Sequence, residues 1–249
     1  MSSMYLKQLV RLTREHGTLA EQQLLSRWQK ELAEFFAPAD RALMNQALGL
    51  ELGIEDTLTL KIILKSRGPM IAPALLEMIR RVPKLAIWGH FILQHQLRFH
   101  CGIKLTPERI THEIYAYPKD HAALSSIIGE NDFMAAVQQL HPLGIGIDDY
   151  RGYSMYYNAI STDWIDTLRK ELGLANWGGA HLWAWQQMRF DGAKLLPGKT
   201  ALELTPMPAH VLARFASHYP FPYFRYLIPL KPHSHGKIGR HHIYWRFSR

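Results

Sequence analysis

Five pairs of short segments with alternating apolar and polar residues run through the chain from residue 48 to residue 248. In segment 57–65 (TLTLKIILK), for example, every second residue is apolar, which is the period of a β-strand with one buried face. Glycine, proline or acidic residues separate the two segments of a pair, as in a β-hairpin. The expected strand pairs are 48–54 with 57–65, 92–104 with 109–117, 143–149 with 152–160, 181–191 with 199–206, and 222–230 with 236–248.

Segments with the apolar spacing of a helix lie before and between these strand pairs. Apolar residues recur at intervals of three and four along 4–36, before the first pair. Helices are expected after the first four pairs, at 70–82, 119–140, 162–172 and 208–218. The architecture, hairpin then helix, therefore repeats, although no sequence motif does. No Ser/Gly-rich linker interrupts the 249 residues, so a single domain, 1–249, is expected.

The two faces of the expected strands differ in character, and this constrains how the sheet is arranged. In 109–117, Glu113 and Tyr115 share one face with other polar residues, whereas Ile114 and Ala116 lie on the opposite face. The helices need the apolar faces to bury against. An open ten-stranded sheet with a solvated polar face is the alternative, but it would leave two exposed edges. The sequence therefore predicts an α+β fold: a closed antiparallel ten-stranded barrel with a solvent-filled lumen, surrounded by helices in five ββα repeats.

Such a lumen would combine cations with aromatic rings. Clustered lysines and arginines bind a diphosphate through charge-assisted hydrogen bonds, and aromatic faces stabilise a carbocation. A carboxylate nearby, such as Glu51, Glu113 or Glu203, can accept the proton that an acceptor loses. Together these groups suit ionisation of an allylic diphosphate. The inward-facing candidates are Lys61, Lys65, Arg98, Lys104, Arg189, Arg225, Arg240 and Arg246, with Tyr115, Tyr153 or Tyr157, Tyr223, Tyr244, Trp183 and Trp185.

The bulk properties narrow the classes of partner. A net charge of +8 favours an anionic partner, but the basic residues are spread along the chain except at 231–249, so nucleic acid is not expected. No apolar run approaches eighteen residues and no signal core begins the chain, so we expect neither membrane insertion nor export, and a cytoplasmic location. The single cysteine, Cys101, cannot form an internal disulfide.

Other site motifs are absent from the sequence. There is no phosphate-binding glycine loop, no Asp-rich metal motif and no Gly-x-Ser-x-Gly elbow. His233, His235, His241 and His242 span a turn and a strand without a nearby carboxylate or cysteine. We therefore interpret them as a solvent-exposed basic tail, and no metal site is expected.

Four stretches carry a resemblance to a known family: GLELGIEDTLTLKI (49–62), CGIKLTPERITHEIYAYPKD (101–120), GIDDYRGYSMYYN (146–158) and GRHHIYWRFS (239–248). With the five hairpin-plus-helix repeats, they resemble the aromatic prenyltransferases of the ABBA fold, and most of all the cyanobactin peptide prenyltransferases. The resemblance implies transfer of a prenyl group, dimethylallyl or longer, from its diphosphate to a nucleophilic side chain of a peptide. Mg²⁺ would assist by neutralising the diphosphate, although the sequence does not require it.

The resemblance and the face pattern together assign roles to individual residues. Glu51 is the expected catalytic base. The other candidates are Lys61, Arg98, Arg189, Arg225 and Arg246 for the diphosphate; Tyr115, Tyr157, Tyr223 and Tyr244 for shielding the cation; and Gly53, Gly102, Glu113 and Trp183 for the acceptor and prenyl pocket. Three alternatives remain open: the same chemistry on a small indole or phenol, a non-catalytic barrel that binds an anionic or aromatic ligand, and a nucleic-acid-binding protein.

Overall fold

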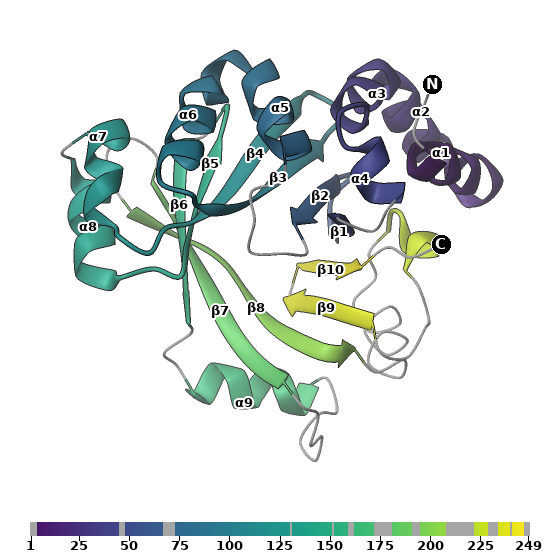
Figure 1. Cartoon of the computed structure of the whole chain (residues 1–249). Helices are drawn as coiled ribbons and strands as arrows, with labels where there is room; N and C mark the ends of the chain where they lie inside the picture. The colour runs from purple at the N-terminus through teal and green to yellow at the C-terminus, as the bar shows by residue number, and fades with distance from the viewer. Residues whose placement is uncertain are drawn as a thin grey trace.

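Ten antiparallel strands close on themselves into one barrel in a computed structural model of the chain (Figure 1). The structure describes residues 4–44, 48–66, 73–129, 131–150, 152–158, 162–171, 181–190, 195–207, 222–228, 234–239 and 241–246. The strands are β1 (Leu48–Glu55), β2 (Leu60–Ser66), β3 (Arg98–Leu105), β4 (Ile110–Tyr117), β5 (Gly144–Asp148), β6 (Gly152–Asn158), β7 (His181–Phe190), β8 (Leu195–Met207), β9 (Ser234–Gly239) and β10 (His242–Arg246). This confirms the expected fold class, and the open-sheet alternative is wrong.

Strand order follows the sequence, and one seam joins the two ends of the sheet. Every strand pairs with its neighbours along the chain, and β1 also pairs with β10. Across the seam, Glu51 lies opposite Arg246, Gly53 opposite Tyr244, and Glu55 opposite His242. The closure leaves no strand edge unpaired among the ten and turns one face of every strand inward.

Helices cover the outside of the barrel, as Figure 1 shows. They are α1 (Met4–His16), α2 (Leu19–Arg27), α3 (Gln29–Phe36), α4 (Asp40–Met44), α5 (Pro73–Arg81), α6 (Ala86–Gln94), α7 (Ser125–Ile128), α8 (Asp132–Leu140) and α9 (Thr162–Glu171), with the 3-10 turns η1 (Pro83–Leu85), η2 (Ala122–Leu124) and η3 (Arg225–Leu227). Within the described ranges, none of these helices is long and apolar enough to cross a membrane.

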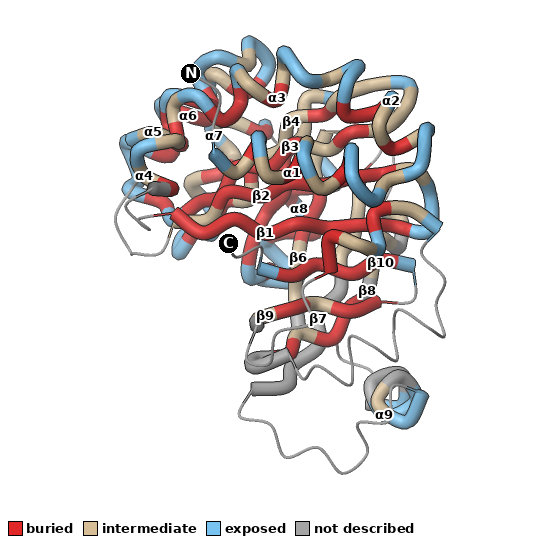
Figure 2. The backbone as a smooth tube through the Cα atoms, turned by 90° about the vertical axis from the view of Figure 1, so that its right-hand side faces the viewer, coloured by how far each residue is buried: buried red, intermediate tan, exposed pale blue. Residues whose placement is uncertain are grey.

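The hydrophobic core lies between the barrel wall and the helices rather than in the lumen. Strands β1, β2 and β3 are buried along most of their length, and the helices bury the side that faces the barrel (Figure 2). On β1 and β2, Leu52, Ile54 and Ile62 are at most 1% exposed and point outward into this layer. Each buried leucine or isoleucine of this kind contributes roughly 1.5–3 kcal/mol through removal of apolar surface from water. The outer layer therefore supplies the stability, and the inner faces are free to carry charge.

The segment expected to form one long helix at 4–36 is divided into three. Thr18 accepts a hydrogen bond from the backbone N–H of Glu21, and the Glu21 carboxylate accepts one from the backbone N–H of Thr18. This capping box begins α2 and ends the continuity with α1. Glu21 also accepts a hydrogen bond from the backbone N–H of Phe224, so the same carboxylate ties α2 to the segment before β9.

The structure differs from three further sequence predictions of strands and helices. The expected strand at 222–230 is wrong: Pro222 cannot donate a ladder hydrogen bond, Phe224 takes a left-handed backbone conformation (φ 58°), and η3 packs on α1. The fifth hairpin is instead β9–β10. The segment 92–104 becomes a strand only at Arg98, because α6 continues to Gln94. The helix expected at 119–140 is interrupted at Gly129 (φ 78°), and that expected at 208–218 lies outside the described residues.

Candidate active site

The barrel lumen is a cavity of about 670 Å³, and all ten strands contribute residues to its wall. Its described lining residues carry more positive than negative charge. The nine cationic ones are Lys61, Lys65, Arg98, Lys104, Arg109, Arg189, Lys199, Lys237 and Arg246, against the four carboxylates of Glu51, Glu113, Asp148 and Glu203. The cavity is thus a basic chamber inside a shell of apolar packing.

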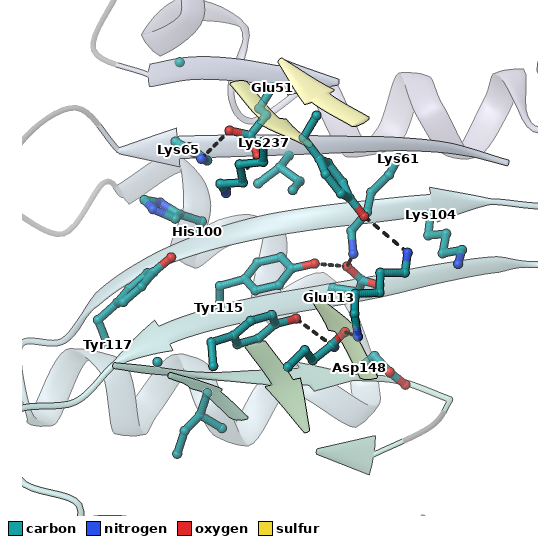
Figure 3. A pocket seen from close by; sticks show the side chains of 18 of the residues that line it. Glu51, Lys61, Lys65, His100, Lys104, Glu113, Tyr115, Tyr117, Asp148 and Lys237 are labelled. Carbon is teal, nitrogen blue, oxygen red and sulfur yellow. Dashed lines mark hydrogen bonds and ion pairs between the residues drawn. The ribbon is translucent and has the colours of Figure 1, made fainter. Parts of the chain in front are cut away.

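The strand registers divide this chamber into two ends. Glu51 and Glu55 both face inward on β1, four residues or about 13 Å apart. Lys65 and Arg246 lie beside Glu51, at what we call the Glu51 end, whereas Lys104 lies at the Glu55 end. Figure 3 shows Glu51, Lys65 and Lys237 together at one side, and Lys61, Lys104 and Glu113 together at the other.

At the Glu51 end, one buried carboxylate is held by two ammonium groups. Lys65 is ion-paired with Glu51 Oε2, and Lys237 Nζ lies 3.3 Å from Oε1. Glu51 is 2% exposed, and burial alone would raise the pKa of its carboxyl group. The charges of Lys237 and Lys65 overcome this effect and hold the pKa of Glu51 well below its usual range. Glu51 is therefore a fully ionised anchor for the two lysines.

A histidine–carboxylate pair borders the same end. His235 Nε2 on β9 lies 2.9 Å from Glu203 Oε1 on β8, and 3.9 Å from Glu51 Oε2. Burial opposes ionisation of Glu203, but the hydrogen bond with His235 and the charge of Lys237 lower the pKa of Glu203 overall. Both side chains reach the cavity.

At the Glu55 end, two lysines share one carboxylate. Lys104 Nζ is 3.2 Å from both carboxylate oxygens of Glu55, and Lys199 forms a second ion pair with Oε1. Burial opposes ionisation of Glu55, but Lys199 and Lys104 lower its pKa to about 2. Burial also lowers the pKa of Lys199 to about 8, and the charges of the nearby Lys104 and Lys61 act in the same direction. The charge of Glu55 opposes this shift. Two ammonium groups thus share one carboxylate here.

Lys61 lies between tyrosine rings at this end of the lumen. Its ammonium is 2.5 Å from Glu113 Oε2, and the Tyr115 hydroxyl donates to the same oxygen. The ammonium also lies 5.2 Å from the centre of the Tyr115 ring and 5.9 Å from that of Tyr244. These are cation–π distances, so the tyrosine faces of this lumen already receive a cation.

Four lumen tyrosines lie against the barrel wall because glycines lie beneath them. A Cβ on Gly53 would overlap the ring of Tyr244, which lies opposite it across the β1–β10 seam. Cβ atoms on Gly146, Gly144 and Gly102 would come within 2.9 Å, 3.1 Å and 3.3 Å of Tyr156, Tyr117 and Tyr115. The missing side chains let the rings lie flat, which keeps the cavity wide and turns aromatic faces toward it.

Most of the lumen residues expected from the sequence do line the cavity: Glu51, Lys61, Arg98, Glu113, Tyr115, Arg189, Tyr244 and Arg246. The strand registers place these residues at different ends of the lumen, however. Arg98 and Arg246 lie toward the Glu51 end, and Lys61 lies toward the Glu55 end. They do not form a single cluster around one ligand group.

The other residues of the expected site do not appear on the described cavity wall. Tyr157 packs on the outer core with Tyr153, so Tyr156 is the lumen tyrosine of β6. Arg225 is exposed and Tyr223 packs on the outer layer, because their segment is not a barrel strand. Gly53 and Gly102 face inward, but beneath Tyr244 and Tyr115 rather than on the cavity wall. Trp183 lies on β7 opposite Glu203, and its side chain is outside what the structure describes.

Several lumen residues were missed in the site assignment. Lys199, Lys237 and His235 contact the carboxylates described above, and Tyr117, His100 and Tyr156 complete the wall. The alternation within 109–117 and 94–104 already placed Tyr117 and His100 inward. The supposed exposed basic tail is mostly barrel wall: His235 and Lys237 reach the lumen and His242 is buried, whereas His241 is exposed.

The lumen carboxylates do not fit a magnesium site. Glu51, Glu55 and Glu113 are each bound by lysine, Glu203 by histidine, and Asp148 accepts a hydrogen bond from the backbone N–H of Tyr150. In the part of the chain that the structure describes, no group of three or more His, Cys, Asp or Glu residues could hold a metal ion. Lysines and arginines therefore supply the positive charge of the lumen, and we assign no step to Mg²⁺.

Comparison with known proteins gives a likeness in fold. No family model matches the sequence, and no curated protein matches it. Among solved structures, a 6-dimethylallyl tryptophan synthase is similar in fold with a TM-score of 0.48 and 13% sequence identity. The likeness covers 80% of this chain and 81% of that one.

The packing of Tyr244 on Gly53 predicts that Gly53→Ala displaces the ring into the lumen. Overpacking of this kind costs about 1–3 kcal/mol, which urea unfolding measures. Gly89→Ala, within α6, is the control, because its Cβ would meet the flexible Arg80 side chain at 3.3 Å and Ile79 at an ordinary contact distance of 3.5 Å. Replacing Tyr244 by Leu should remove most of the cost of Gly53→Ala. Equal stability of Gly53→Ala and wild type would contradict this packing.

Two buried histidines predict an acid-sensitive fold. Burial, helped by nearby lysines, lowers the pKa of His100 and of His242 to about 3, from an ordinary 6.5. The unfolded chain therefore binds more protons below pH 6.5, and the free energy of unfolding falls by up to about 1.4 kcal/mol per pH unit for each histidine. Between pH 6.5 and 5.0 the lumen carboxylates add little to this loss, because their pKa values are lowered from 4.5 in the fold and they stay mostly ionised in both states.

The measurement is urea unfolding at pH 7.5 and pH 5.0. His100→Gln should reduce the difference in free energy of unfolding between the two pH values. The exposed His241→Gln should leave it unchanged. An undiminished difference in His100→Gln would show that His100 is not held neutral.

Proposed function

We propose that this protein transfers a prenyl group from its diphosphate to an acceptor bound in the same lumen. One observation carries the proposal: a cavity lined by more cations than carboxylates brings lysines together with tyrosine faces. Ammonium groups stabilise a departing diphosphate, and aromatic faces stabilise the allylic cation that remains. A non-catalytic anion-binding barrel would need the lysines but not the tyrosine faces that surround them.

The diphosphate is assigned to the Glu55 end. Lys61, Lys104 and Lys199 lie there with the carboxylates of Glu55 and Glu113, and Asp148 lies opposite Glu113 in the β4–β5 register. Lys104 and Lys199 share the single charge of Glu55, so an incoming anion relieves the excess charge of these two ammonium groups. The Tyr244 hydroxyl, 3.4 Å from Lys199 Nζ, is a further polar group beside this site. Of the residues expected to bind the diphosphate, Lys61 is retained here.

The prenyl chain is then placed over the tyrosines. Tyr115 and Tyr244 both approach Lys61, and the rings of Tyr115 and Tyr156 are 5.8 Å apart. A carbocation formed beside the diphosphate would meet these faces first. The closed barrel limits access of water, which would otherwise capture the cation.

The acceptor is placed at the Glu51 end. This end opens at a rim where Arg98, Tyr117 and Leu143 are exposed, with Tyr117 at 36% and Leu143 at 44%. A peptide side chain can enter there while its backbone stays outside, which is the leading proposal. A small indole or phenol would fit the same space, since cavities of about 300–1,000 Å³ suit ligands of this size.

Glu51 was expected to act as the base, and its surroundings suggest another role. Both of its oxygens contact lysines, and its lowered pKa makes it a weak proton acceptor. We propose that Glu51 fixes Lys65 and Lys237 in place at the acceptor end.

This assignment predicts that inorganic pyrophosphate binds at the Glu55 end. Lys104→Gln and Lys199→Gln should each weaken binding about 10- to 100-fold in calorimetric titration, since a hydrogen bond to a charged group contributes about 1.5–3 kcal/mol. The exposed Lys30→Gln is the control. If Arg98→Gln and Arg246→Gln weaken binding while the two lysine variants do not, the diphosphate belongs at the other end.

The reaction itself predicts products with one added prenyl mass. The protein is incubated with dimethylallyl and geranyl diphosphates and with peptides, indoles and phenols, and products are identified by mass spectrometry. Tyr244→Leu should form less product at saturating donor because it removes one aromatic face. Absence of product with every pair, together with no pyrophosphate-dependent rise in Tm, would refute the proposed function.

A further inference from the structure

Prenyl transfer to an aromatic carbon, a hydroxyl or an amine ends with loss of one proton from the acceptor. We propose that His235, oriented by Glu203, receives that proton. The inference rests on the proposed function and adds a catalytic pair that neither the sequence pattern nor the family resemblance assigned.

The geometry of the pair suits this role. Glu203 on β8 lies opposite Lys237 in the β8–β9 register, and His235 lies two residues before Lys237 on the same face of β9. His235 Nε2 and Glu203 Oε1 are 2.9 Å apart, a normal hydrogen-bond distance. Their side chains are 18% and 14% exposed, and both line the cavity. A carboxylate at this distance fixes the imidazole ring and stabilises the imidazolium that forms on protonation.

Other lumen carboxylates are poorer proton acceptors. Glu51, Glu55 and Glu113 each neutralise at least one buried lysine. Protonating any of them would leave a buried ammonium without its counter-ion, which is costly. Protonating His235 instead creates an imidazolium beside a carboxylate that is already in place, so the charge that forms is compensated at once.

The step balances in protons and electrons. The C1–O bond of the prenyl diphosphate breaks, and the diphosphate leaves with the bonding pair toward Lys104 and Lys199. The acceptor atom donates an electron pair to C1 and forms the new bond. The acceptor then loses its proton to the imidazole of His235, and product release returns that proton to solvent.

Charged groups from several strands face His235 and affect its protonation. They are Glu203 on β8, Glu51 on β1, Lys65 on β2, Lys237 on β9 and Arg246 on β10, opposite Glu51. The pair therefore belongs to a charge network, and its test needs a readout beyond loss of activity.

The experiment measures product formation as a function of pH with the acceptor found for the wild-type protein. His235→Gln should lower kcat about 10²- to 10⁴-fold and remove the acid limb of the pH profile, because no imidazole remains to be protonated. Its affinity for inorganic pyrophosphate should stay within about threefold of wild type. Added imidazole should restore activity to His235→Ala, which a merely structural histidine would not allow.

Glu203 is tested as the positioning residue of the pair. Glu203→Gln should lower kcat more than it changes KM, and Glu203→Asp should recover part of the loss. The matched control is His241→Gln, because His241 forms a similar pair with Asp56, 2.9 Å apart but exposed and outside the lumen. His241→Gln should keep the wild-type rate and pH profile.

Two results separate failure of this inference from failure of the proposed function. If the wild-type protein forms product but His235→Gln has the same rate and pH profile, or imidazole does not restore folded His235→Ala, His235 is not the proton acceptor. If the wild-type protein forms no product with any donor and acceptor, prenyl transfer itself is refuted, and this role falls with it.

Discussion

Pairing of buried charge is the constraint on which this structure depends. Closing ten strands into a barrel turns polar side chains inward, away from bulk water, where an unpaired ammonium or carboxylate is costly. The lumen meets that cost with mixed clusters built from distant parts of the chain. Lys199 reaches Glu55 and Lys237 reaches Glu51, across 144 and 186 residues of sequence. The inner wall is therefore specified by tertiary pairing, and the outer layer by apolar packing.

The lumen carries more positive than negative charge, which favours binding of an anion. Nine cationic side chains against four carboxylates line the described cavity, and at the Glu55 end Lys104 and Lys199 share the single carboxylate of Glu55. The tyrosine rings of the lumen stabilise a cation, because the ammonium of Lys61 lies near two ring faces. An anionic leaving group and a cationic intermediate would thus each find a complementary surface, a few ångströms apart.

The sequence predicts the strands and their faces well because alternation is a local property. Tyr115 and Glu113 were placed inward correctly by counting residues within β4. Tyr157 was misplaced because β6 carries tyrosines on both faces, and only Met155 marks the outer one. The aromatic segment 222–230 has the sequence pattern of a strand, but the left-handed backbone conformation of Phe224 is not compatible with a regular strand. Pairs such as His235 with Glu203 arise only when β8 and β9 are aligned, which no local pattern reports.

The claim that the lumen is a reaction chamber is tested most directly by a crystal structure with an unreactive prenyl thiodiphosphate. We predict its phosphate groups within hydrogen-bond distance of Lys104 and Lys199, and its first prenyl carbons over the rings of Tyr115 and Tyr244. The Glu51 end should remain open beside His235. A donor analogue bound outside the barrel, or with its phosphates among Arg98 and Arg246, would contradict this arrangement.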